Sequence, residues 1–344
     1  KALASILSLG AGASLGPEDP SVQIGSSLGS WLGGRLNWTD ERRKLLVAAG
    51  AASAIASAFN APIAGVFFAL EVILGEFSTT SFGAVVMSAV LSSAVTQSLA
   101  GGNPVFGNLE YTLGHPIQLP FYVVLGILLA IMSIITIRFI DWQINLWHNR
   151  IKIWLPLEMA LVGVGIGVVG LFLPEILGTG EEFMHEVLSG HLETTIMMLV
   201  VIGLMKLVMT AISQGAGFVG GVFAPTLFIG IALGSAYGRF VNQLIPVLDI
   251  GNPQAYAIAG MAGMLAGVVR APMTAILIVF ELTDDYTLIL PIMLTAVICT
   301  LIIEQTGPPG IYMWSLVKQG LHLQQGRDID LMQGISVQDA MITP

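Results

Sequence analysis

Apolar residues form long, dense runs that short polar segments separate along the whole chain. The runs cover residues 46–73, 82–100, 117–140, 153–173, 195–212, 215–238, 255–282 and 286–303. Several of them reach the roughly 20 residues that a helix needs to span a membrane. The pattern therefore predicts an all-α, multi-pass membrane protein that faces a lipid bilayer.

Composition supports this class and argues against others. Hydrophobic residues make up 55% of the chain and charged residues only 10%. The net charge of −9 gives no support for a nucleic-acid partner. The single cysteine, Cys299, excludes an internal disulfide framework, and the five histidines stand apart from one another. We therefore expect no metal and no resident cofactor.

Two stretches far apart in the chain are copies of one pattern. The segment Gly16–Gly33 aligns without a gap with Gly221–Gly238, an offset of 205 residues. The positions that recur, numbered in the first copy, are Gly16, Pro20, Ile24, Gly25, Leu28, Gly29, Ser30 and Gly33. A repeat of this kind is typical of membrane transporters.

A second pair of copies follows in the same order. Residues 50–72 match residues 260–282, an offset of 210, and each copy carries an Ala-Pro pair and then an acid, Glu71 or Glu281. Two blocks in one order at nearly one offset indicate two homologous halves, at about 1–110 and about 120–305.

Proline and glycine interrupt the apolar runs in both copies, so we expect broken helices that begin inside the membrane. Pro20 and Pro225 stand where a first helical turn tolerates proline. The N–H groups of such a turn are unpaired and its dipole is positive, which favours anions without any basic side chain. The repeat therefore predicts an anion site between the two helix starts, around Glu18 and Phe223.

Glu18 is the strongest candidate among the ionisable residues inside the apolar runs, where such residues usually have a function. Its carboxylate could take the place of an anion at the helix start, and protonation would release it, which makes Glu18 a gate or a proton carrier. The alternative is an acid that only stabilises the helix dipole.

Other residues of the repeats are better explained by structure. The glycines recur every four residues, as in helix packing within membranes. Glu71 and Glu281 occupy equivalent positions, which favours a shared role in capping or pairing. We expect Arg270 to neutralise Glu281 or Asp284, and Lys206 to snorkel or pair.

Five short motifs follow one another along the chain: Gly16-Pro-Glu-Asp-Pro20, Ala58-Phe-Asn-Ala-Pro-Ile-Ala-Gly65, Gly221-Val-Phe-Ala-Pro225, Arg270-Ala-Pro-Met-Thr274 and Glu281-Leu-Thr-Asp-Asp-Tyr286. In sequence and order they resemble the motifs of the CLC family of chloride channels and chloride/proton exchangers. The resemblance extends from about residue 1 to residue 320.

The resemblance implies a fold and a set of site residues. It implies a CLC-type inverted-repeat bundle of tilted and broken transmembrane helices. It also implies a homodimer with one anion pathway in each subunit, and we expect the protein in the plasma (inner) membrane. Glu18 matches the gating glutamate, and the backbone amides of Val222 and Phe223 match those that bind the central chloride. Tyr286 matches the tyrosine whose hydroxyl closes the site from inside.

The resemblance also divides the chain. Residues 1–320 are the expected transmembrane domain. Residues 321–344 are the expected linker and the start of a cytoplasmic regulatory domain of the cystathionine-β-synthase type, a candidate for nucleotide binding. Because the chain begins with Lys1 and no signal-peptide pattern precedes the first motif, we expect an internal fragment that lacks the family's N-terminal helices and its chloride-binding serine segment.

Two departures from the family pattern concern mechanism. Pro17 and Asp19 flank Glu18, where the family usually has a basic residue and glycine. Val72 stands where many exchangers have a glutamate that accepts protons from the cytoplasmic side. We therefore expect channel-like or loosely coupled chloride transport, with a chloride/proton antiporter as the alternative and a fluoride- or nitrate-selective relative as a further one.

An enzyme is the remaining class. An intramembrane serine protease needs a histidine inside a spanning segment, and no histidine here lies convincingly within one. We therefore expect no enzymatic activity, with chloride as a transported substrate.

Overall fold

The computed structural model describes residues 1–102, 105–106, 116–150, 154–192, 194–245, 252–318, 323–324 and 327–328. Over these residues the chain is a bundle of helices, which confirms the all-α prediction. The strands described are two short ones, β1 (Leu323–Gln324) and β2 (Arg327–Asp328), which pair antiparallel. The predicted start of a regulatory domain, residues 335–344, lies outside the described residues.

The first half contains α1 (Ala2–Gly10), α2 (Glu18–Arg35), α3 (Asp40–Phe59), α4 (Pro62–Phe68) with a π-helical continuation (Ala69–Leu74), and α5 (Thr79–Ala100). The second contains α6 (Leu119–Asn145), α7 (Leu155–Gly170), α8 (Glu181–Ser189), α9 (Ile196–Gly215), α10 (Phe223–Leu244), α11 (Pro253–Val269), α12 (Pro272–Thr283) and α13 (Ile289–Thr306), followed by α14 (Ile311–Lys318).

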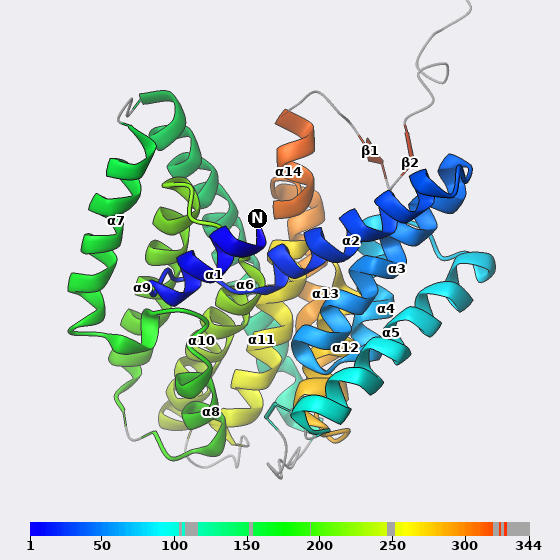
Figure 1. Ribbon diagram of the computed structural model, residues 1–344. Helices are drawn as coiled ribbons and strands as arrows, with labels where there is room; N and C mark the ends of the chain where they lie inside the picture. Colours follow the sequence, from blue (N-terminus) through cyan, green and yellow to red (C-terminus); the bar gives the residue numbers. More distant parts are fainter. Residues whose placement is uncertain are drawn as a thin grey trace, which may run out of the picture.

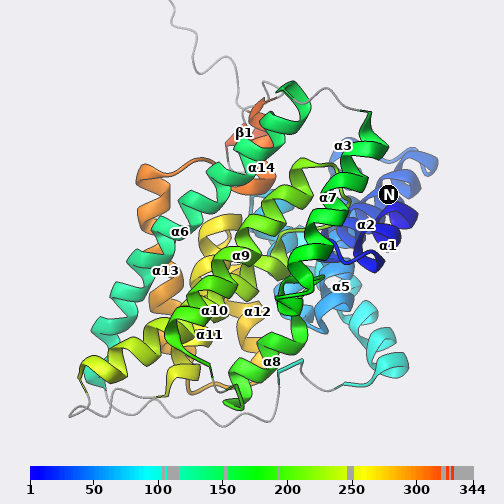
Figure 2. The ribbon, with the colours of Figure 1, turned by 90° about the vertical axis from the view of Figure 1, so that its left-hand side faces the viewer.

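The two halves lie side by side. In Figure 1, α2 to α5 lie on the right, α7 to α10 lie on the left, and α11 to α13 lie between them. Figure 2, turned by a quarter, shows α7 on the outside of the bundle, and its buried residues pack against α9. The largest buried cluster in the described structure combines residues of both halves, such as Phe68 of α4 and Ala275 of α12.

Within the described residues, five helical stretches are long and apolar enough to cross a membrane: Ser81–Ala100, Leu119–His148, Ile196–Gly215, Phe223–Leu244 and Ile289–Trp314. Others are too short to span alone. Helix α12 has 12 residues, which at about 1.5 Å per residue falls well short of a hydrocarbon core about 30 Å thick. These short helices are pieces of the broken runs that the sequence predicts.

Both Ala-Pro motifs break a helix in the same way. Helix α3 ends at Asn60 and α11 ends at Arg270, and both residues adopt the left-handed conformation, with φ of 51° and 60°. Proline then starts the next helix at Pro62 and Pro272, where its missing N–H costs no hydrogen bond. The repeat thus encodes a sharp change of direction at the same place in each half.

Arg270 has a different partner from the one that the sequence suggested. Its guanidinium donates from Nη2 to the carbonyl oxygens of Ile303, at 2.8 Å, and of Gly307, at 3.0 Å. The end of α13 offers unpaired carbonyls and a negative dipole, so a cation is favourable there. The expected pairing with Glu281 or Asp284 is therefore wrong.

Glu71 and Glu281 hold the halves together by a reciprocal exchange. Glu71 accepts hydrogen bonds from the backbone N–H of Met273, at 3.2 Å, and of Thr274, at 2.8 Å, in the first turn of α12. Glu281 accepts from the N–H of Ile63, at 2.9 Å, and of Ala64, at 2.6 Å, in the first turn of α4.

Each acid therefore caps the broken helix of the other half, which confirms the capping role that the repeat predicts. Reciprocal contacts of this kind are those of two units that a two-fold axis relates.

The repeated glycines confirm the prediction of close helix packing. A Cβ atom at Gly25 would lie 2.2 Å from the carbonyl oxygen of Gly50, and a Cβ atom at Gly230 would lie 2.3 Å from that of Gly260. The pairs α2–α3 and α10–α11 thus pack backbone against backbone, which only glycine allows. This close approach fixes the direction of α2 and α10, whose first residues are Glu18 and Phe223.

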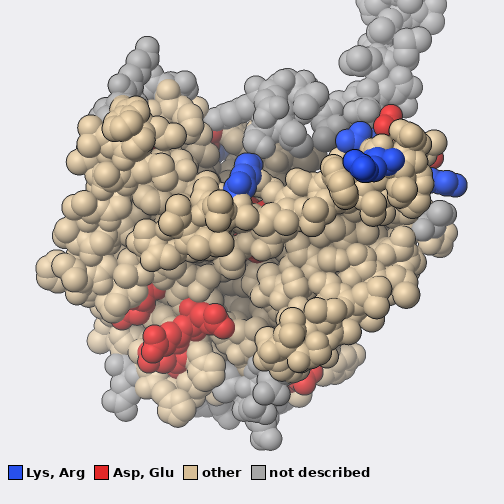
Figure 3. All heavy atoms as spheres, in the orientation of Figure 1, with Lys and Arg blue, Asp and Glu red and all other residues tan. Residues whose placement is uncertain are grey.

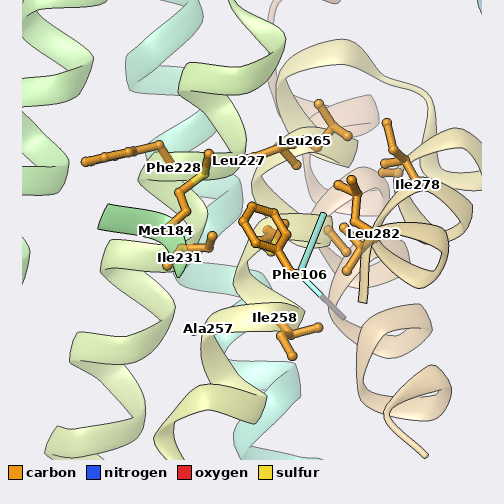
Figure 4. Close-up of a cluster of buried hydrophobic side chains, with 14 of the residues drawn as sticks. Phe106, Met184, Leu227, Phe228, Ile231, Ala257, Ile258, Leu265, Ile278 and Leu282 are labelled. Atoms are coloured by element: carbon orange, nitrogen blue, oxygen red, sulfur yellow. The ribbon is translucent and has the colours of Figure 1, made fainter. Parts of the chain in front are cut away.

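The largest buried cluster joins the halves around Phe106. Figure 4 shows Phe106 between residues of α10 and α11, such as Leu227 and Ile258, and residues of α12, such as Leu282. The backbone N–H of Phe106 donates to the carbonyl oxygen of Leu282 at 2.9 Å. The connection between the halves is in this way part of the core.

Substitution of Gly260 by alanine should destabilise the protein. The new Cβ would lie 2.2 Å from the carbonyl oxygen of Gly230, so the α10–α11 pair must separate, at a cost of about 1–3 kcal/mol. Gly165→Ala in α7 is the control, because no atom lies within 4 Å of a Cβ there. Thermal unfolding in detergent should show a lower melting temperature for Gly260→Ala alone; equal melting temperatures would contradict the packing argument.

Candidate functional site

The segments that lead into α2 and α10 pair with each other. Gly16 and Gly221 exchange two backbone hydrogen bonds, with N–H to oxygen distances of 2.9 Å and 2.6 Å. The helices begin directly after this bridge, at Glu18 and Phe223. The predicted meeting of two repeated helix starts is therefore present, and equivalent residues occupy the first position of each helix.

The carboxylate of Glu18 lies at the start of the opposite helix. Its Oε1 accepts a hydrogen bond of 3.0 Å from the backbone N–H of Ala224, and the N–H of Phe223 also points toward it. The side chain is 1% exposed, and its Oε2 is buried without a hydrogen-bond partner among the described residues. A carboxylate thus occupies the amide cradle in which an anion was predicted to bind.

Glycine at 16 and 221 makes room for this carboxylate. A Cβ atom at Gly16 would lie 2.0 Å from Oε2 of Glu18, and one at Gly221 would lie 2.6 Å from Oε1. The two repeated glycines therefore serve the site directly, because any side chain at either position would displace the acid.

Phe223 and Val222 lie at the site, as predicted. Both are buried, and Val222 precedes the first turn of α10. The ring of Phe223 packs against Phe59, with ring centroids 5.3 Å apart, and edge-on against Phe68, at 6.4 Å. These two rings come from the first half, so both halves wall the cradle with aromatic groups.

Ala224 is a site residue that was not predicted from the sequence. Its N–H donates to Glu18, whereas the predicted ligands were the amides of Val222 and Phe223. The available signal was general: each of the first four N–H groups of a helix lacks an intrahelical partner, and Ala224 is the second residue of α10.

Tyr286 does not reach the site, and its predicted role is wrong. It lies in the turn between α12 and α13, is 74% exposed, and packs edge-on against Phe280. The tyrosine at the site is Tyr312 in α14. Its hydroxyl donates a hydrogen bond of 2.7 Å to Oδ1 of Asp19, and its ring packs edge-on against Phe68.

Lys206 is buried near the site without an ion pair among the described contacts. Its Nζ donates to the carbonyl oxygens of Ile176, at 3.0 Å, and Gly178, at 2.7 Å, and lies 4.7 Å from the ring centroid of Phe228. It is close enough to Glu18 for electrostatic attraction. Lys206 therefore neither snorkels to a surface nor forms a direct salt bridge, the two roles that the sequence suggested.

Val72 lies in the π-helical turn that follows α4 and packs, half-buried, against the central core. Its apolar side chain can neither bind nor carry a proton.

An acidic hollow opens on the same face as α1. It has a volume of about 650 Å³ and is lined by residues of α8 and of the preceding loop, including Glu175, Glu181, Glu182 and Glu186. Figure 3 shows acidic side chains gathered below α1, on the side of α8. No three histidine, cysteine, aspartate or glutamate residues in the described part of the chain come together as metal ligands would.

Known proteins share this sequence pattern and this fold. Residues 1–304 match the family model described as voltage gated chloride channel. The chloride channel protein CLC-f of Arabidopsis thaliana is 38% identical over an alignment 341 residues long, which covers 93% of this chain and 42% of that protein. The H(+)/Cl(-) exchange transporter ClcA of Vibrio parahaemolyticus is 35% identical, over 88% of this chain and 66% of that protein.

A solved structure agrees with the fold. The crystal structure of a slow cyanobacterial Cl-/H+ antiporter superposes with a TM-score of 0.82 at 30% identity, over 90% of this chain and 73% of that chain. The chain thus spans between two fifths and two thirds of the length of the two curated relatives.

Replacement of Lys206 by methionine should destabilise the protein. It would leave the carbonyls of Ile176 and Gly178 without this donor, and a buried acceptor that loses its partner costs about 1–3 kcal/mol. Lys206→Arg, which keeps the charge and several donors, should lose less. Thermal unfolding in detergent measures both variants, and a methionine variant as stable as the parent would contradict this assignment.

Proposed function

The chain belongs to the voltage-gated chloride channel family, and on that premise we propose that it carries chloride across a membrane in exchange for protons. Glu18 is the gate in this proposal, and the first-turn amides of α10 are the anion ligands. The proposed anion site is lined by backbone N–H groups and not by lysine or arginine side chains. An anion therefore binds there weakly enough to leave again.

One observation carries the proposal: the hydrogen bond from the N–H of Ala224 to the carboxylate of Glu18. Unpaired N–H groups at a helix start favour negative charge, and here the bound negative charge belongs to the protein itself. A chloride ion that approaches the start of α10 must compete with this carboxylate for the same amides.

Competition for the amides couples the two ions. When Glu18 takes up a proton it loses its charge, so its attraction to the N–H groups of Phe223 and Ala224 weakens and chloride can replace it. When the proton leaves, the carboxylate returns and displaces the chloride. Because the cradle holds either the ionised acid or the anion, proton uptake accompanies chloride binding, and proton release accompanies chloride displacement.

Relatives favour exchange over the channel-like transport that Val72 suggested. The Vibrio relative is named an H(+)/Cl(-) exchange transporter and the cyanobacterial structure is that of a Cl-/H+ antiporter, at 35% and 30% identity. We therefore replace the channel-like expectation with the antiporter alternative. Chloride is the proposed substrate because the curated relatives carry chloride in their names.

The proposal extends to the organisation of the protein. This chain is an integral membrane protein, and we place it in the plasma (inner) membrane as one half of a homodimer, with a separate anion pathway in each subunit. The exposed surface supports a position in a membrane, since α5 and α7 present large apolar side chains such as Leu99, Val164 and Leu157 to the exterior.

Reconstitution in proteoliposomes tests the function. An imposed chloride gradient should drive protons uphill in the parent protein, recorded as a pH change together with chloride flux. Glu18→Gln should move chloride without protons, and its flux should be insensitive to pH, because the amide cannot titrate. Glu158→Gln, which removes a carboxyl buried in α7, is the matched control and should keep the coupling.

Two results would contradict separate parts of the proposal. Chloride flux in the parent protein without any proton movement would refute exchange. An unchanged pH dependence in Glu18→Gln would show that Glu18 is not the gate, even if the parent protein couples the two ions.

A further inference from the structure

A second acid directly follows the gate. Glu18 and Asp19 are the first two residues of α2, so their side chains leave the helix axis about 100° apart. The carboxylate of Glu18 turns toward α10, where Ala224 binds it, and that of Asp19 turns toward α14, where Tyr312 binds it. Glu18 is buried and Asp19 is only partly so.

A proton on Glu18 is best placed on Oε2, the carboxyl oxygen that has no hydrogen-bond partner among the described residues. Oε1 accepts a hydrogen bond from the N–H of Ala224, and a proton on that oxygen would weaken this bond. Oε2 is buried and has no hydrogen-bond partner among the described residues. A buried oxygen without a donor is costly, whereas the same oxygen with its own hydrogen can donate to a nearby acceptor.

Among the ionisable groups near Glu18, Asp19 is the acid that can exchange a proton with Oε2 of Glu18. Those that face the two carboxyls are Lys206 of α9, Tyr312 of α14 and Lys1 at the start of α1. Lys206 is fixed by two carbonyls, and the hydroxyl of Tyr312 is already donated to Asp19. Val72 stands where many exchangers have a proton-accepting glutamate, and its apolar side chain cannot carry a proton.

We propose that Asp19 relays protons to and from Glu18, from the side of the molecule on which α14 lies. This rests on the proposed exchange function. Protonated Asp19 gives its proton to Oε2 of ionised Glu18 through an intervening water molecule. Asp19 becomes the carboxylate, stabilised by the hydroxyl of Tyr312 and the charge of Lys1, and Glu18 becomes neutral and releases the amides. Water on the partly exposed side of Asp19 restores its proton, and the reverse sequence serves the opposite direction.

Three variants separate the carboxyl from the hydrogen bond that it accepts. Asp19→Asn removes the titratable group but keeps the shape and an oxygen that Tyr312 can still bond. Tyr312→Phe removes the hydrogen bond but keeps the acid. Asp19→Glu keeps a carboxyl at the end of a longer side chain. Glu158→Gln again controls for the loss of a buried acid elsewhere in the chain.

The measurement is the number of protons moved per chloride in proteoliposomes at a fixed chloride gradient. Asp19→Asn should lower this ratio to background while chloride still moves, as expected for a transporter that has lost its proton supply. Asp19→Glu should restore part of the ratio, and Tyr312→Phe should keep a ratio well above that of Asp19→Asn, even if transport slows.

The outcomes distinguish this inference from the proposed function. If the parent protein couples protons to chloride and Asp19→Asn couples them equally well, the relay is refuted and exchange stands. If Tyr312→Phe lowers the number of protons moved per chloride as far as Asp19→Asn does, coupling depends on the hydrogen bond between Tyr312 and Asp19 and not on proton transfer by Asp19. The relay is then also refuted. If the parent protein moves no protons, both proposals fail together.

Discussion

Helices that begin inside an apolar interior expose N–H groups that have no intrahelical acceptor, and water cannot supply one there. Among the helix starts at the centre of the described structure, those of α4, α10 and α12 share one solution to this difficulty. In each case a carboxylate from the other half of the chain accepts from the first turn: Glu281 for α4, Glu18 for α10 and Glu71 for α12. The fold around the site depends on these three acceptors.

The three carboxylates differ in how completely they are bound, and this difference separates structure from function. Glu71 and Glu281 use both oxygens, each on its own backbone N–H, so both are fixed caps. Glu18 uses one oxygen and leaves the other buried and unpaired. A carboxylate with one unpaired oxygen can take up a proton there without first losing a hydrogen bond, which is the property that the proposed gate requires.

The duplication explains why the site is asymmetric although the frame is symmetric. The glycine contacts, the left-handed breaks at Asn60 and Arg270 and the exchanged caps recur in both halves. The first residues of the matching helices do not, because one half has Glu18 where the other has Phe223. A titratable side chain and an amide with an apolar ring therefore face each other across the Gly16–Gly221 bridge, and the pair makes one site instead of two.

Several features of the site and its frame could be predicted from the sequence because they depend on local chemistry. Proline after alanine starts a helix, glycine every fourth residue allows close packing, and an acid at a helix start faces a positive dipole, whatever the rest of the fold does. The breaks and the packed glycines followed from these rules, the equivalence of Glu18 and Phe223 followed from the internal repeat, and the family's fold followed from the motifs.

The tertiary structure decided the partners, because a side chain's partner depends on residues far away in the sequence. Glu71 and Thr274 are separated by 203 positions, and Asp19 and Tyr312 by 293. No local pattern could show that the caps are exchanged between halves, or that Lys206 and Arg270 bind carbonyls rather than acids. The sequence alone therefore determined where helices break and where an anion is favoured; the long-range packing determined that Tyr312, not Tyr286, meets the acids of the site.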